Sequence, residues 1–111
     1  MALTKMTKRD SYVDGFEYSE TIASGETGDD IRIFPLGLDG PRITCRIIAG
    51  ANTGKFQFTC SPDANVIAGT AVWTDWPKGV VTGTDYDTLL GPVTGLRGVS
   101  SAGEIKIEVV I

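Results

Sequence analysis

The sequence predicts an all-β protein: an antiparallel two-sheet sandwich, jelly-roll or immunoglobulin-like in topology, preceded by a short N-terminal arm. Polar and apolar residues alternate with period two in several segments, whereas no long stretch holds the period of about 3.6 residues that marks a helix. The 14 glycines and 5 prolines divide the alternating segments into short strands. Because 111 residues is the size of one domain, we expect a basic flexible arm over residues 1–12 and one domain over residues 13–111.

The first predicted strands are short. Apolar residues alternate over residues 16–22, which predicts a strand with one face toward the core. A turn-rich segment, residues 24–30, separates it from a second strand over residues 31–33. Pro35 is expected to end this strand, because proline has no N–H to donate to a sheet.

The clearest unit is a predicted β-hairpin over residues 43–60. Alternating apolar residues lie on both sides of a glycine-containing turn at residues 50–54. In the register that this turn favours, Cys45 lies directly opposite Cys60, with Cα atoms about 4.5–5.5 Å apart. That spacing permits a disulfide, whereas synthesis in a reducing cytosol favours two buried thiols, so both states of this cross-strand pair stay open.

Three further strands are expected in the C-terminal half, over residues 71–74, 93–99 and 105–111. Between the first two of these strands, residues 79–87 are rich in Gly, Thr and Asp, which predicts a loop.

Trp73 and Trp76 are the most prominent aromatic side chains. Because they are three residues apart, they cannot both lie on one side of a regular strand. We expect one to pack in the core and the other to lie near a strand end, at a subunit contact or as a platform for a sugar ring.

Charge is distributed unevenly. Residues 1–10 carry +2, from Lys5, Lys8 and Arg9 against Asp10, and the total of −4 leaves −6 for the rest of the chain. An acidic body does not attract nucleic-acid phosphates. The basic arm is expected either to remain solvated or to bind an acidic partner, including a neighbouring copy of the chain.

Composition argues against much catalytic and cofactor chemistry. The chain contains no His, and its 2 Cys cannot form a four-thiolate zinc site. The acidic pairs Asp29–Asp30 and Asp85/Asp87 lack the calcium-loop pattern, so they are expected to be solvated. No apolar run approaches the ~20 residues that cross a bilayer, and no secretory signal is evident. We expect no enzymatic activity, no cofactor, no metal, and neither a nucleic-acid nor a membrane partner.

The C-terminal half also contains a series of distinctive segments: residues 66–73, Trp76-Pro77-Lys78-Gly79, residues 91–97 and the closing strand 104–111. These segments resemble the small β-structured virion proteins of tailed bacteriophages, in which a Pro-Val-Thr-x-Leu-Arg strand, a Ser/Gly turn and a final alternating strand recur. The resemblance covers roughly residues 42–111 and carries no catalytic residue with it.

The resemblance implies a non-enzymatic structural protein that decorates and stabilises the capsid in many copies, a cement protein assembled into the virion in the host cytoplasm. Its partners would be the major capsid protein or other virion proteins, and a homo-oligomer, with a trimer favoured, is implied. Two alternatives stay open: a head–tail connector, tail or fibre component, and a carbohydrate-binding β-sandwich module. The candidate interface residues are Lys5, Lys8, Arg9, Trp73 and Trp76.

Overall fold

The computed structural model describes residues 3–8, 16–33, 42–90 and 93–111, and they are almost entirely β-structure. The elements are β1 (Leu3–Lys5), β2 (Thr7–Lys8), β3 (Phe16–Ile22), β4 (Asp30–Arg32), β5 (Arg42–Thr59), α1 (Asp63–Ala68), β6 (Thr74–Asp75), β7 (Val81–Leu90), β8 (Gly95–Ala102) and β9 (Ile105–Val110). The prediction of an all-β protein is confirmed.

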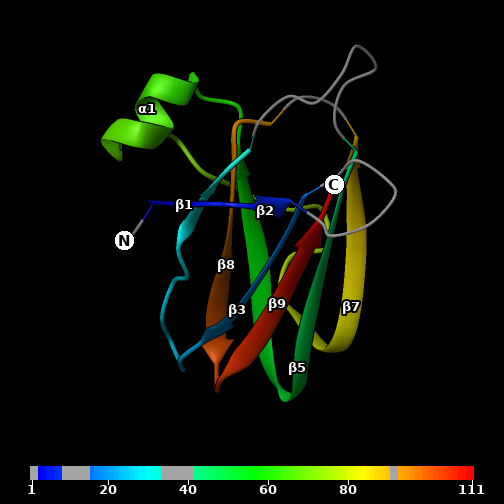
Figure 1. The fold of residues 1–111 in the computed structure, drawn as a ribbon. Coiled ribbons are helices and arrows are strands. Elements are labelled where there is room, and N and C mark those ends of the chain that lie inside the picture. Colours follow the sequence, from blue (N-terminus) through cyan, green and yellow to red (C-terminus); the bar gives the residue numbers. More distant parts are fainter. Residues whose placement is uncertain (1–2, 9–15, 34–41, 91–92) are drawn as a thin grey trace.

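Strand β5 organises the fold because it belongs to both faces of the molecule. Its residues 42–48 pair with β7 and, from Thr44 onward, with β9. Its residues 53–59 pair with β8, and two positions each also pair with the start of β7 and with β6. Between these stretches lie a register shift against β7 and Gly50, whose φ of 60° is readily adopted by glycine. In Figure 1, β5 runs to the lower end of the molecule and returns on the other side, and β8 and β9 follow it.

This bend divides the sheet into two facing parts. The β9 half consists of β7, residues 42–48 of β5, β9, β3 and β2. The β8 half consists of β6, residues 53–59 of β5, β8, β4 and β1. Hydrogen bonding joins both halves into one nine-stranded sheet among the described residues, rather than two separate sheets, and the sheet is nearly closed into a barrel.

The N-terminal segment contributes to this closure. β1 pairs with β4 of the β8 half, in a parallel arrangement that the antiparallel prediction did not include, and β2 pairs with β3 of the β9 half. Met6, the residue between them, is buried in the core cluster. Residues 3–8 of the expected arm therefore lie in or between two short strands that pair with the sheet, which gives open strand edges and an apolar side chain their partners. Residues 9–12 of the expected arm lie outside the described residues.

The predicted hairpin over residues 43–60 is also wrong in its pairing. The chain bends near the expected place, but the two arms of β5 pair with other strands and not with each other. Cys45 is buried opposite Asp87 and Val109, whereas Cys60 is exposed beyond the end of β5, and no disulfide joins them. The alternation of apolar residues shows which side chains face the core, but it does not show which strand pairs with which. A single bent strand therefore has the same pattern as a hairpin.

Two local predictions also differ from the structure, and a short helix is present that the sequence did not indicate. The expected loop over residues 79–87 lies largely within β7, a ten-residue strand. Of the expected strand 71–74, only Thr74 lies in a strand, the two-residue β6. Helix α1 has six residues, too few for a helical period to be visible in the sequence. Strand β7 was not predicted from the sequence, because its Thr, Gly and Asp residues are compatible with a solvated edge strand as well as with a loop.

The hydrophobic core lies between the two halves. The β9 half supplies Ile43, Cys45, Ile47, Ile105, Ile107 and Val109, and the β8 half supplies Phe56, Leu96 and Ile31, each less than 2% exposed. The halves approach closely at Gly98, where an added Cβ would lie 2.7 Å from Ile22 Cδ1. Trp76 extends this core. Its ring packs edge-on against that of Phe56, with the ring centroids 5.1 Å apart, and its indole N–H donates to the carbonyl oxygen of Gly79.

Candidate functional site

The outer face of the β9 half carries side chains aligned in rows across the strands. Strand pairing places Tyr86 beside Arg46, Arg46 beside Glu108, and Glu108 beside Ser19. Adjacent strands are about 4.8 Å apart, so this row of four spans roughly 14 Å. A neighbouring row runs from Thr88 through Thr44 and Val110 to Glu17 and Thr7.

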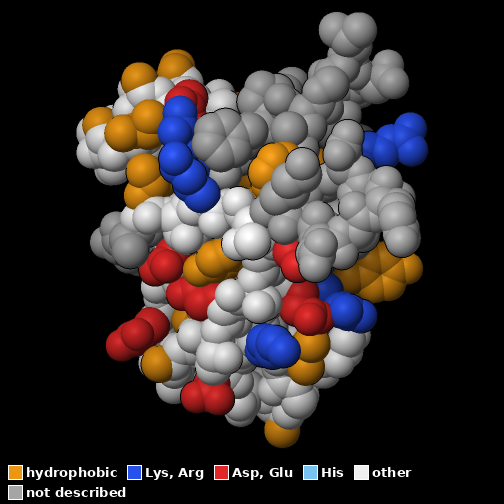
Figure 2. Space-filling model, viewed as in Figure 1, with side chains coloured by type: hydrophobic (Ala, Val, Ile, Leu, Met, Phe, Trp, Pro, Cys, Tyr) orange, Lys and Arg blue, Asp and Glu red, His pale blue; other side chains and the backbone are white. Residues whose placement is uncertain are grey.

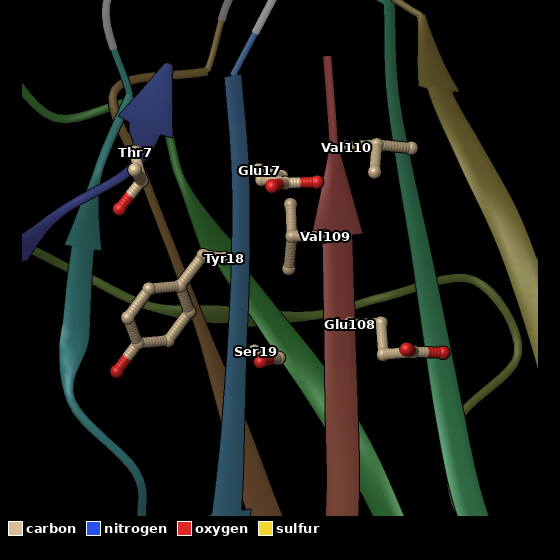
Figure 3. A pocket seen from close by; sticks show the side chains of 7 residues that line it. All are labelled: Thr7, Glu17, Tyr18, Ser19, Glu108, Val109 and Val110. Atoms are coloured by element: carbon tan, nitrogen blue, oxygen red, sulfur yellow. The ribbon is translucent and has the colours of Figure 1, made fainter. Parts of the chain in front are cut away.

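The two rows border a hollow surface that we call the outer groove. It consists of two adjoining cavities of about 440 and 310 Å³, which share Glu108 and Val110. The larger cavity lies over β2, β3 and β9 (Figure 3), and the smaller extends over β5 and β7 to Tyr86. Their volumes lie at the lower end of the range for small-ligand sites.

Polar groups in the outer groove can form hydrogen bonds beyond those they already make. Arg46 Nε and Nη2 both contact Glu108 Oε1, at 3.0 and 2.8 Å. Among the described residues nothing binds Glu108 Oε2, so that oxygen can accept further hydrogen bonds. Thr44 and Thr88 share a hydroxyl–hydroxyl contact of 3.2 Å, and Tyr86 is 62% exposed. The groove therefore offers an aromatic face beside hydrogen-bonding groups of both kinds.

A second surface, the α1 patch, lies at the end of the molecule opposite the β5 bend. Ile67 of α1 is 50% exposed and Val72, which follows the helix, is 75% exposed. Figure 2 shows hydrophobic side chains gathered over α1 in this view. Exposed clusters of apolar side chains commonly mark contact surfaces.

Several interactions hold the α1 patch in place. Arg32 of β4 forms a two-pronged ion pair with Asp63, with Nε 2.8 Å from Oδ1, and it holds the pKa of Asp63 below its ordinary value. Val66 is the buried residue of α1, and Gly69 ends the helix with a φ of 76°. The N–H of Val72 donates to Ser61 Oγ at 3.0 Å. The patch is thus an anchored projection.

A polar cluster closes the seam between β3 and the segment leading into β4. The Tyr18 hydroxyl lies 3.3 Å from both Glu20 Oε1 and Asp29 Oδ2, and Figure 3 shows its ring directed toward that segment. Both Glu20 oxygens accept the N–H of Asp29. Burial, followed by the neighbouring carboxylates, raises the pKa of Tyr18, and burial raises the pKa of Glu20. These contacts join the two halves, which is a structural role.

The acidic pairs singled out from the sequence have protein partners. Asp85 lies 3.0 Å from Lys78 Nζ, which lowers the pKa of its carboxyl group. Asp87 accepts the N–H of Thr88 at 2.8 Å. Within the described ranges, no group of three or more carboxylate or thiol side chains is placed to hold a metal ion.

The candidate interface residues that the structure describes lie in different environments. Lys5 is exposed on β1, and Lys8 is the last residue of β2. The side chain of Lys8 and the whole of Arg9 lie outside the described part of the chain. Trp76 is 1% exposed and is a core residue. Trp73 is half-buried, and the Arg97 guanidinium lies 4.2 Å from its ring centroid.

Sequence reasoning missed Tyr86 and the aligned row beside it, because residues 79–87 were predicted to be a loop. The available signal was the series Thr84, Tyr86 and Thr88, in which residues of high β-propensity alternate with Asp85 and Asp87. Ile67 and Val72 lacked any comparable signal, since single exposed apolar residues cannot be distinguished from core residues in a sequence.

Comparisons with known proteins relate the chain to others by fold. No family model matches the chain, and no curated protein matches its sequence. The protein YomS, derived from the SPBc2 prophage, matches 92% of this chain and 97% of its own, at 11% identity and a TM-score of 0.54. This likeness shows a shared fold over almost the whole of both chains.

Looser likenesses extend to proteins of diverse kinds. Peruvianin-I, a cysteine peptidase from Thevetia peruviana latex, matches 86% of this chain at 10% identity and a TM-score of 0.47, and the chain spans 48% of its length. A Bacillus endospore appendage protein, from a family of disulfide-linked pili, matches 86% of both chains at 13% identity and a TM-score of 0.36. These scores are too low to bear on function. Among the described residues, no helix is long and apolar enough to cross a membrane.

Proposed function

We propose that the chain is a non-enzymatic structural protein of a tailed-phage virion, which docks on the capsid in many copies and stabilises it. The sequence resemblance described above supports this role, and so does the end-to-end fold likeness to a prophage-derived protein. A homo-oligomer, with a trimer favoured, is part of the proposal. The chain would be assembled into the virion in the host cytoplasm.

The α1 patch is the observation that carries the docking role. Ile67 and Val72 keep half and three quarters of their surface exposed although their backbone is anchored by several polar contacts. A fixed projection loses little conformational entropy when it binds, which favours its use as a contact. A small apolar contact is weak alone, but many copies on a shell, joined as oligomers, multiply its effect.

The direct test measures the protein on purified particles of the phage that encodes it. We expect hundreds of copies per virion by quantitative mass spectrometry, whereas tens or fewer would indicate a neck, tail or fibre component instead. Absence from the particles would end both versions. Light scattering on the purified chain tests for the trimer.

Docking through the α1 patch is tested with particles that lack the protein. Ile67→Asp and Val72→Asp are expected to lower occupancy of the shell, because a charge at the contact must be desolvated. Val80→Asp is the matched control: this exposed residue precedes β7 at the other end of the molecule, near the β5 bend. Equal occupancy for all three variants would exclude the α1 patch as the docking surface.

A further inference from the structure

We propose that the outer groove is a binding site for an uncharged oligosaccharide, with Tyr86 as its stacking platform and the Arg46–Glu108 pair as its hydrogen-bonding centre. This site is separate from the α1 patch, and the inference stands whether or not the chain is part of a virion.

The first argument is the composition of the aligned row. A sugar ring presents C–H groups on its faces and hydroxyl groups around its rim, so it binds an aromatic ring beside paired donors and acceptors. Tyr86 supplies an exposed ring, 62% accessible, next to Arg46 in the adjacent strand. Glu108 Oε2 can accept from a hydroxyl, and the N–H groups of Arg46 not used on Glu108 can donate to one.

The second argument is preorganisation. Arg46 and Glu108 lie on the central strands β5 and β9 and orient each other through two contacts of 3.0 and 2.8 Å. The hydroxyl groups of Thr44 and Thr88 are likewise held together in the next row. Side chains fixed on a rigid sheet lose little freedom when a ligand binds, and this favours recognition of a small polar molecule.

The third argument is charge. The groove is bordered by two carboxylates, Glu17 and Glu108, against one guanidinium, Arg46. The net charge of −1 on these described lining residues disfavours phosphorylated, sialylated or uronic-acid ligands, which would approach an acidic body. An uncharged saccharide meets no such repulsion.

A peptide strand added to the neighbouring edge of β7 fits the structure less well. The N–H groups of Tyr86 and Thr88 are already bonded, at 2.8 Å each, to the carboxylates of Asp85 and Asp87. An incoming strand would have to displace these carboxylates before it could pair with β7. At Tyr86 and Thr88, the edge of β7 is therefore not ready to pair with a second copy of the chain.

The experiment titrates the full chain with neutral trisaccharides of glucose, galactose and N-acetylglucosamine, and with a sialylated trisaccharide, by calorimetry and NMR. We expect at least one neutral trisaccharide to bind and to shift the amide signals of Arg46 and Glu108. Tyr86→Ala should weaken binding about tenfold or more, whereas Tyr86→Phe keeps the ring and should stay within about threefold of the original. Val72→Ala, on the α1 patch, is the control for unrelated surface change.

Several results would overturn this assignment. They are no binding by any neutral trisaccharide, equal binding by the Tyr86→Ala variant, and preferential binding of the sialylated probe. Loss of binding in Trp73→Ala, with Tyr86→Ala unaffected, would place the sugar site on the β8 half instead. A change in oligomer mass in Tyr86→Ala, seen by light scattering, would identify a second copy as the occupant of the groove.

Discussion

Replacing Trp76 with alanine is the sharpest test of the core. Trp76 is 1% exposed, and its indole donates its N–H to the carbonyl oxygen of Gly79. Its ring packs edge-on against Phe56, with the ring centroids 5.1 Å apart. Removing a buried tryptophan side chain costs about 3–5 kcal/mol. A domain of this size is typically stable by about 5–15 kcal/mol, so Trp76→Ala should lose a large share of its unfolding free energy. At about 4 °C per kcal/mol, the expected fall in Tm is roughly 12–20 °C.

The assay is urea unfolding followed by far-UV circular dichroism, because removal of a tryptophan alters the fluorescence signal itself. Trp76→Phe is expected to fall between the two extremes, since it keeps an aromatic contact with Phe56 but leaves the Gly79 carbonyl without its donor. Val72→Ala removes an exposed side chain and should stay within about 0.5 kcal/mol of the original. A loss below about 1 kcal/mol for Trp76→Ala would refute its placement in the core and restore it as an interface candidate.

Three further predictions concern other parts of the fold. Cys60 is exposed, whereas burial raises the pKa of Cys45 to about 12, so Ellman's reagent should titrate one thiol per native chain and two in denaturant; two native thiols would contradict the burial of Cys45. Burial raises the folded pKa of Glu20 above its ordinary value of 4.5, so the folded state binds its proton first. As the pH falls from about 7 toward 4.5, the unfolding free energy of the original protein should therefore rise relative to that of the Glu20→Gln variant. Urea unfolding of both proteins at several pH values measures this difference, and a difference that does not change with pH would contradict the burial of Glu20. Gly98→Ala should cost about 1–3 kcal/mol in thermal unfolding because its Cβ would crowd the core, and an unchanged Tm would mean that the halves are not in close contact there.

The residues that face the core could be identified from the sequence with good accuracy. The alternations over residues 16–22, 43–49 and 105–111 place their inward members correctly, from Ile22 to Val109. Each such series is read from one strand alone, and burial of one face imposes its period on any partner. The predicted set of core-facing residues is therefore correct, although the pairing predicted for Cys45 and Cys60 is wrong.

The functional surfaces could not be predicted in the same way. The row Tyr86–Arg46–Glu108–Ser19 is assembled from four strands, and its members share no spacing or motif in the sequence. Trp73 and Trp76 attracted attention by residue type, yet their burial depends on Arg97 and Phe56, which lie far away along the chain.

The sequence by itself determined that this chain is β-structured, acidic and alternating, because period and composition are local properties that no partner strand can change. Tertiary structure alone decided that β5 bends to join both halves, that residues 3–8 pair with the sheet, and that Tyr86 stands beside an ion pair. Each of these depends on hydrogen bonds or contacts between distant segments, and such contacts are selected by the packing of the whole chain.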